Sequence, residues 1–161
     1  MLDRQRLTQK NIAEIKYAKR FGYIFGIMLL FFGLLLDLYF IYELEKSTNW
    51  LIIYNISIIF ISFLMPLFIN KKYNNDLLYN EKTIKTDILR YKREEDSYEA
   101  GSGYPAPNAL GMKKSIRYKF TIENVEYDVE KEIYNQVEIG DEVELHYALY
   151  SKMLLEITKK I

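Results

Sequence analysis

The sequence predicts a membrane α-helical hairpin, made of two transmembrane helices, followed by a small antiparallel all-β domain. Two long apolar runs, 21–42 and 50–69, come one after the other. Each has the roughly 20 residues that a helix needs to cross about 30 Å of hydrocarbon. Only the short segment 43–49 separates them, so the two helices are expected to run antiparallel. From residue 81 onward, apolar residues recur at alternate positions, which is typical of half-buried strands.

Charge is balanced overall but unevenly distributed. The 161 residues include 22 Lys and Arg and 22 Asp and Glu, yet both apolar runs are almost free of them. The remainder, 81–161, is long enough for one domain of fewer than about 100 residues. The chain has no cysteine, which excludes disulfides and thiolate metal sites.

Basic residues flank the hairpin on one side. They are Arg4, Arg6, Lys10, Lys16, Lys19 and Arg20 before the first run, and Lys71, Lys72, Lys82 and Lys85 after the second. The connection holds only Lys46, so the positive-inside rule places both termini in the cytoplasm. The basic segment 1–20 is either an amphipathic helix on the membrane surface or an extension of the first span. Segment 70–80 is expected to be a linker, and a helical continuation of the second span is also open.

Asp37 is the one acidic residue well inside a run. If the connection turns about Lys46, Asn55 lies at the same depth, and we predict an Asp37–Asn55 hydrogen bond between the helices. Such bonds contribute about 0.6 to 2 kcal/mol in membranes. The structural interpretation is favoured over an ion-handling carboxylate, because a transport path needs more polar positions than the runs offer.

Three glycines of the first run, Gly22, Gly26 and Gly33, recur on or near one helix face. Small residues let another helix approach closely. Pro66 lies at the depth of Gly26, so the glycines are expected to receive either the second helix or a second copy of the chain.

The β domain is expected to have four or five strands in a barrel or a sandwich. The predicted strands cover 83–91, 116–123, 126–132, the part of 138–150 that follows the Gly140–Asp141 turn, and 152–158. Asn124 and the pair Gly140–Asp141 are the expected turn residues. The long loop 92–114 is expected either to be disordered or to contact a partner. The candidates for contact within it are Tyr98, Tyr104, Leu110 and Met112.

Two motifs of the predicted β domain resemble a bacterial family of domains of unknown function, the one numbered thirty-five ninety-two. Its first motif is matched by Tyr118, Phe120, Ile122, Asn124 and Tyr127, and its second by Gly140, Asp141, Val143, Leu145 and Tyr147. Asn124 stands where the family usually has glycine, and the usual proline after the second motif is missing. The resemblance implies two membrane spans with a small β domain in a bacterial inner membrane, and it implies no catalytic residue.

No catalytic constellation is predicted. His146 is the only histidine, and without cysteine or a second histidine no common zinc site or catalytic triad can form. Acidic and basic residues are mixed, which does not favour nucleic-acid binding. We therefore expect no enzyme activity, no cofactor and no metal.

The leading functional hypothesis is a membrane-anchored scaffold whose β domain binds a protein partner. An immunity protein that protects its producer from a secreted toxin is the first alternative. A small accessory subunit of a channel or transporter is the second. The expected partners are the lipid bilayer, an unidentified protein such as a toxin, and a second copy of the chain.

Overall fold

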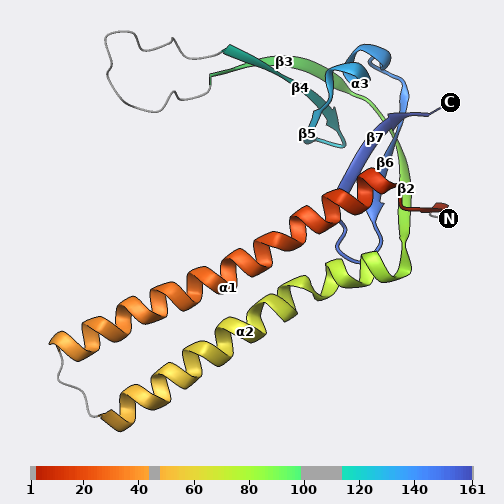
Figure 1. Cartoon of the computed structure of the whole chain (residues 1–161). Coiled ribbons are helices and arrows are strands. Elements are labelled where there is room, and N and C mark those ends of the chain that lie inside the picture. The colour runs from red at the N-terminus through yellow and green to blue at the C-terminus, as the bar shows by residue number, and fades with distance from the viewer. Residues whose placement is uncertain (1–2, 44–47, 99–113, 161) are drawn as a thin grey trace, which may run out of the picture. The chain divides into compact units, whose positions relative to one another are not determined.

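The computed structural model describes residues 3–43, 48–98 and 114–160 and confirms the predicted fold class: a helical hairpin and a small antiparallel β domain (Figure 1). The helices are α1 (Gln9–Glu43), α2 (Thr48–Tyr79) and the short α3 (Lys131–Gln136). The strands are β1 (Asp3–Arg6), β2 (Glu81–Ile88), β3 (Tyr91–Tyr98), β4 (Lys114–Ile122), β5 (Val125–Val129), β6 (Glu142–Ala148) and β7 (Leu154–Lys159).

The chain divides into two compact units. The helical unit comprises Arg4–Lys82 and Ala148–Met153, and therefore includes the turn between β6 and β7. The β unit comprises Thr83–Tyr147 and Leu154–Ile161, together with the residues before Arg4.

Helix α1 begins before the apolar run because Thr8 and Asn11 cap its first turn reciprocally. The Asn11 backbone N–H donates to Thr8 Oγ1 at 3.2 Å, and the Thr8 N–H donates to Asn11 Oδ1 at 3.1 Å. This arrangement satisfies two backbone donors that a helix start leaves unpaired. Residues 9–20 are consequently the first turns of α1, in line with the second of the two interpretations of the basic segment.

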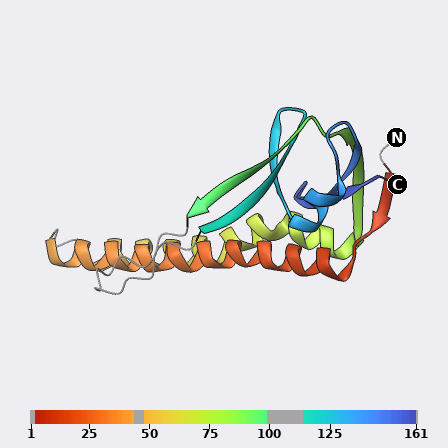
Figure 2. The ribbon, with the colours of Figure 1, turned by 90° about the horizontal axis from the view of Figure 1, so that it is seen from above.

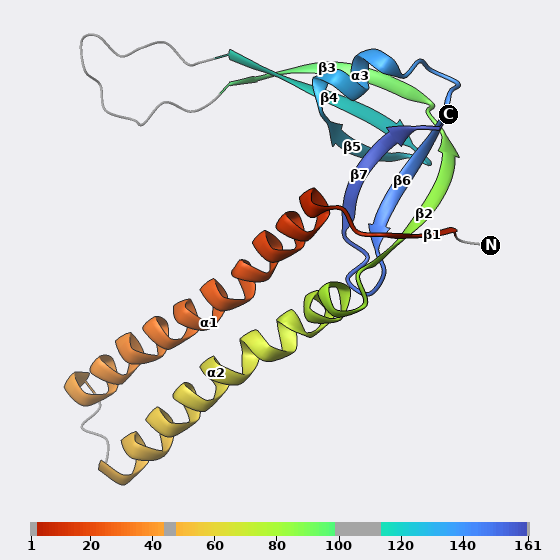
Figure 3. The same cartoon turned by 45° about the vertical axis from the view of Figure 1, so that its right-hand side comes forward.

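Helix α2 likewise continues through the predicted linker and ends at Tyr79. Asn80 follows in the left-handed region with φ of 56°, and its N–H donates to the Asp76 carbonyl at 2.9 Å. An asparagine in this conformation is a common way to end a helix. Figures 1 and 3 show α1 and α2 side by side along their length.

Both helices are long and apolar enough to cross a membrane. In the most apolar stretch of each helix only 11% is buried within the protein. The core helix of a water-soluble protein buries most of its apolar surface, whereas these helices leave large side chains such as Ile27, Ile53 and Phe63 uncovered.

Asp76 joins the end of α2 to the turn between β6 and β7. Its side chain is fully buried, and its two carboxylate oxygens accept the backbone N–H of Tyr150 at 2.6 Å and of Ser151 at 3.0 Å. Nearby, the rings of Tyr79 and Tyr150 lie 4.9 Å apart. A buried carboxylate is stable only when hydrogen bonds compensate its lost hydration, and these two donors provide that compensation.

The strands form two sheets, a four-stranded sheet in the order β1-β2-β6-β7 and a three-stranded sheet in the order β3-β4-β5. Figure 3 shows β2, β6 and β7 lying next to one another, and Figure 2 shows the long β3–β4 ribbon. The described residues thus contain seven strands rather than four or five, and neither sheet closes into a barrel. Strand β1 was expected to be part of a basic segment, and β3 to be part of a loop.

The prediction failed at β3 because its sequence, YKREEDSY, lacks the apolar alternation of a half-buried strand. Register explains why it pairs nevertheless. Lys92 lies opposite Phe120 on the inner face, and its ammonium group sits 5.1 Å from the ring centre of Tyr134. It also donates to the Val137 carbonyl at 2.9 Å. The aliphatic part of the Lys92 side chain thus packs on the inner face, at a position where the alternation of a half-buried strand calls for an apolar residue.

The core of the β unit contains seven buried side chains: Leu89, Phe120, Ile122, Val137, Val143, Leu145 and Ile157. Helix α3, which the sequence did not predict, adds Tyr134, whose ring lies 4.9 Å from that of Tyr118 and 5.9 Å from that of Phe120. The turns lie where they were predicted. Asn124 has φ of 68° and Gly140 has φ of 95°, values that asparagine and glycine adopt readily.

Burial and a hydrogen bond to Tyr127 raise the pKa of the Tyr147 phenol above its ordinary value of 10.0. The two hydroxyl oxygens lie 3.3 Å apart. Above pH 10.0 the unfolded chain releases the Tyr147 proton while the folded chain keeps it, so stability falls as pH rises through this value. We expect the stability advantage of the wild type over Tyr147→Phe to shrink between pH 8 and pH 11, measured by thermal unfolding in detergent. An advantage that stays constant over this range would contradict the prediction.

Candidate functional site

The structure shows no hydrogen bond between Asp37 and Asn55. Asn55 Nδ2 donates to the Leu51 carbonyl at 3.0 Å within its own helix, and Asp37 Oδ1 is buried without a hydrogen-bond partner. An amide that satisfies itself on the preceding turn gains little from a partner on the other helix. A polar contact between the two helices near this level is made by Tyr54 Oη, which donates to the Gly33 carbonyl at 3.2 Å.

All three predicted helix-packing glycines of α1 face α2. A Cβ built on Gly22 would lie 2.4 Å from Asn70 Oδ1, and one on Gly26 would lie 2.5 Å from Pro66 Cγ. A Cβ on Gly33 would lie 2.4 Å from Ile58 Cγ2. Within one chain, therefore, the second helix already occupies the glycine face. Pro66 packs at the depth that the sequence predicted for it.

The predicted contact residues of the long loop lie largely outside the described residues. Tyr104, Leu110 and Met112 belong to the segment 99–113, which the structure does not describe. The backbone of Tyr98 is the end of β3 and pairs with Lys114. A role for these four residues in partner binding stays a prediction.

Charged side chains cover the outer face of the three-stranded sheet and pair with one another. Lys119 Nζ lies 2.5 Å from Glu95, and Arg93 lies 3.0 Å from Glu126. Weaker pairs of 3.7 and 3.8 Å connect the two groups crosswise. The Lys119 ammonium lowers the pKa of Glu95 through a hydrogen bond and its charge, and Glu95 raises the pKa of Lys119 in return. Glu95 and Lys119 therefore stay ionised near neutral pH, and the acidic and basic side chains of this face pair with one another.

His146 is buried rather than exposed. Its Nε2 lies 3.0 Å from Thr158 Oγ1, and the carboxylates of Glu144 and Glu156 lie 3.7 and 3.9 Å from its ring nitrogens. Within residues 3–43, 48–98 and 114–160, no three histidine or acidic side chains come together as a metal site. The cross-strand partners assign His146 a structural role in the β6–β7 pair.

Four exposed apolar residues of the β unit come from strand ends and a turn that backbone hydrogen bonds and strand pairing bring close to one another. The apolar corner consists of Ile88, Tyr91, Val125 and Ile139, which are 53%, 68%, 49% and 58% exposed. They come from the end of β2, the start of β3, the start of β5 and the turn before β6. Single exposed apolar residues are ordinary, whereas several together indicate an interaction surface.

Hydrogen bonds fix the backbone of the apolar corner. Gly140 N–H donates to the Leu89 carbonyl at 2.9 Å, and Leu89 N–H donates to the Asp141 carbonyl at 3.0 Å. In the three-stranded sheet, Tyr91 lies opposite Thr121 on the outer face, and Val125 lies opposite Ile122 on the other face, so the corner presents apolar side chains on both sides of the sheet edge. The corner residues are thus presented by ordered strands and turns, which reduces the entropy lost on binding.

The sequence carried only a partial signal for this surface. Ile88 and Tyr91 were assigned to one continuous strand, 83–91. The structure instead ends β2 at Ile88 and begins β3 at Tyr91, and the bend between them exposes both side chains. Ile139 precedes the predicted Gly140–Asp141 turn, and this was the one local sign of exposure.

No protein-family model, curated protein or solved structure matches this chain.

Proposed function

We propose that this protein is a membrane-anchored scaffold without catalytic activity, which holds its β unit at the cytoplasmic face of a bacterial inner membrane to bind a protein partner. The observation that supports it most is the apolar corner. It combines an exposed apolar centre with charged neighbours, as protein interfaces do. Lys85 bonds with Glu123 and lies 3.4 Å from Asp87, so these three residues form part of the polar rim.

The hairpin supports the proposed location. A helix of 35 residues extends about 50 Å, and one of 32 residues nearly as far, which exceeds the roughly 30 Å of the hydrocarbon layer. The apolar parts, 21–42 and 50–69, fill the layer, and the basic ends of both helices protrude on one side. By the positive-inside rule this side is the cytoplasm, which places both chain termini and the β unit there.

Site-specific photocrosslinking in cells tests the scaffold proposal. A photoreactive amino acid at Val125 of the full chain is expected to form a protein adduct of defined mass. The double variant Ile88→Ser/Tyr91→Ser is expected to reduce the adduct several-fold, because central apolar side chains contribute most of the energy of an interface.

The matched control is Ile116→Ser, which removes a side chain that is 46% exposed in β4 away from the corner. We expect this variant to crosslink like the wild type. Equal crosslinking in all three proteins, or adducts with lipid alone, would reject the corner as the binding surface.

A further inference from the structure

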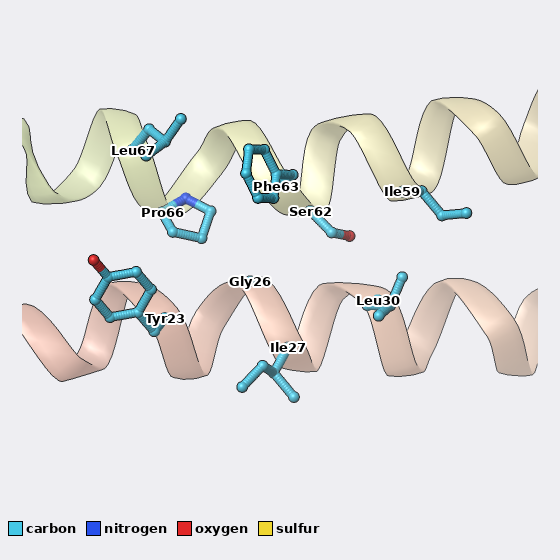
Figure 4. Close-up of a pocket in the computed structure, with 9 residues that line it drawn as sticks. All are labelled: Tyr23, Gly26, Ile27, Leu30, Ile59, Ser62, Phe63, Pro66 and Leu67. Atoms are coloured by element: carbon cyan, nitrogen blue, oxygen red, sulfur yellow. The ribbon is translucent and has the colours of Figure 1, made fainter.

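An apolar groove lies between the two membrane helices. Its volume is about 410 Å³, and it is lined by Tyr23, Gly26, Ile27, Leu30, Ile59, Ser62, Phe63, Pro66 and Leu67 (Figure 4). Figure 4 shows Tyr23 and Pro66 at one end of the groove and Leu30 and Ile59 at the other. Apolar cavities do not hold ordered water, so the groove is suited to a hydrocarbon occupant.

Gly26 and Pro66 approach each other closely at this groove. Without a side chain on Gly26, the Pro66 ring and the Ser62 carbonyl reach the α1 backbone. Proline also lacks the N–H that would bond this carbonyl within α2. Gly26, Ser62 and Pro66 all line the groove, so this close approach forms part of its wall.

Two lysines, Lys19 and Lys71, lie one helical turn beyond the end of the groove that Tyr23 and Leu67 line. Lys19 precedes Tyr23 by four residues, and Lys71 follows Leu67 by four. Residues four apart share a helix face, so each lysine lies on the side of its helix that lines the groove. The Lys19 ammonium sits 5.8 Å from the centre of the Tyr23 ring, which places the charge at this end.

The charged residues next to Lys19 and Lys71 in the sequence are basic. Arg20 and Lys72 are the neighbours of the two lysines, and neither 15–36 nor 50–75 contains an acidic residue. At the same level Asn70 is 1% exposed, and both its Oδ1 and its Nδ2 lack a hydrogen-bond partner. An unsatisfied buried amide is costly, and an oxygen-rich ligand group at this level would give its N–H a partner.

From this combination we infer that the groove binds one anionic phospholipid. An acyl chain occupies the space between Tyr23 and Ile59, and the phosphate lies against Lys19 and Lys71. A phospholipid fits because it joins a hydrocarbon chain to a phosphate over the distance of a helical turn. A net negative headgroup is favoured over a zwitterionic one because Lys19 and Lys71 lie one helical turn beyond this end of the groove, each next to a further basic residue in the sequence. This inference rests on the membrane location proposed above and is independent of the apolar corner.

Native mass spectrometry of the full chain in detergent tests the inference, with phosphatidylglycerol and phosphatidylcholine offered at equal concentration. We expect each wild-type chain to retain one phosphatidylglycerol molecule in preference to phosphatidylcholine. Lys19→Gln/Lys71→Gln is expected to reduce this preference about thirtyfold, because two basic residues near anionic lipid together contribute about 2 kcal/mol of binding energy. Lys131→Gln/Lys152→Gln removes the same charge from exposed positions elsewhere and should leave the preference intact.

A second pair of variants distinguishes lipid binding in the groove from nonspecific electrostatic attraction of lipid to the protein surface. Ile59→Trp fills the groove and is expected to reduce retention of both lipids, whereas Ile53→Trp adds the same side chain at a position that is 67% exposed and should change nothing. Equal retention of the two lipids by the wild type, or equal losses in variant and control, would overturn the inference. A chain that inserts into cell membranes and crosslinks through its corner, yet retains no lipid, would overturn this inference alone.

Discussion

Asp76→Ala is expected to release the turn between β6 and β7 and to lower the free energy of unfolding by about 3 kcal/mol or more. The substitution leaves the N–H groups of Tyr150 and Ser151 without their acceptor, and a hydrogen bond to a charged group contributes about 1.5 to 3 kcal/mol. Asp76 also lies in the last turn of α2, where a negative charge opposes the helix dipole by about 0.3 to 1 kcal/mol. Removing that repulsion offsets only a small part of the loss.

Hydrogen exchange and thermal unfolding in detergent measure this effect. The Tyr150 and Ser151 amides should exchange much faster in Asp76→Ala, and Asp76→Asn should fall between the two because it keeps one acceptor oxygen. Asn74→Ala, an exposed change on the same helix, is the control. Unchanged protection of the two amides in Asp76→Ala would show that Asp76 does not hold the turn.

The importance of Asp76 could be read only in part from the sequence. An acidic residue in the last turn of a helix conflicts with the helix dipole, and such local conflicts often mark a residue that is held by the tertiary structure. The sequence, however, left open whether 70–80 is a linker or a helical continuation of the second span, because this segment is polar. Its partners are backbone N–H groups more than 70 residues away, and no side-chain pattern reveals those.

The hairpin was the most predictable part, since apolar length depends on composition alone. Depth was predictable too: the contacts of Gly22 with Asn70 and of Gly26 with Pro66 follow the register that the sequence assigned to Asp37 and Asn55. The predicted hydrogen bond between Asp37 and Asn55 was wrong, because the asparagine side chain donates to a carbonyl of its own helix instead. In the β unit, β3 escaped prediction because a lysine stem replaces the apolar residue that alternation requires.

The second large effect is expected at Gly26. A Cβ at this position would lie 2.5 Å from Pro66 Cγ and 2.8 Å from the Ser62 carbonyl oxygen, and neither the proline ring nor the backbone can turn aside. Gly26→Leu should therefore separate the helices and cost about 3 kcal/mol, the upper part of the usual range for overpacking. Unfolding of the purified chain by titration with a denaturing detergent, followed by circular dichroism, measures this loss.

Gly22→Ala and Gly26→Ala separate packing from helix propensity. Both exchanges favour the helix by about 1 kcal/mol, but the Cβ of residue 22 meets only the Asn70 side chain, at 2.4 Å. That amide makes no hydrogen bonds through its side chain and can rotate. We expect Gly22→Ala to be neutral or stabilising and Gly26→Ala to be destabilising despite the same gain in propensity. Equal effects at the two positions would mean that the helices adjust as rigid rods, and that the Pro66 contact does not determine how closely they pack.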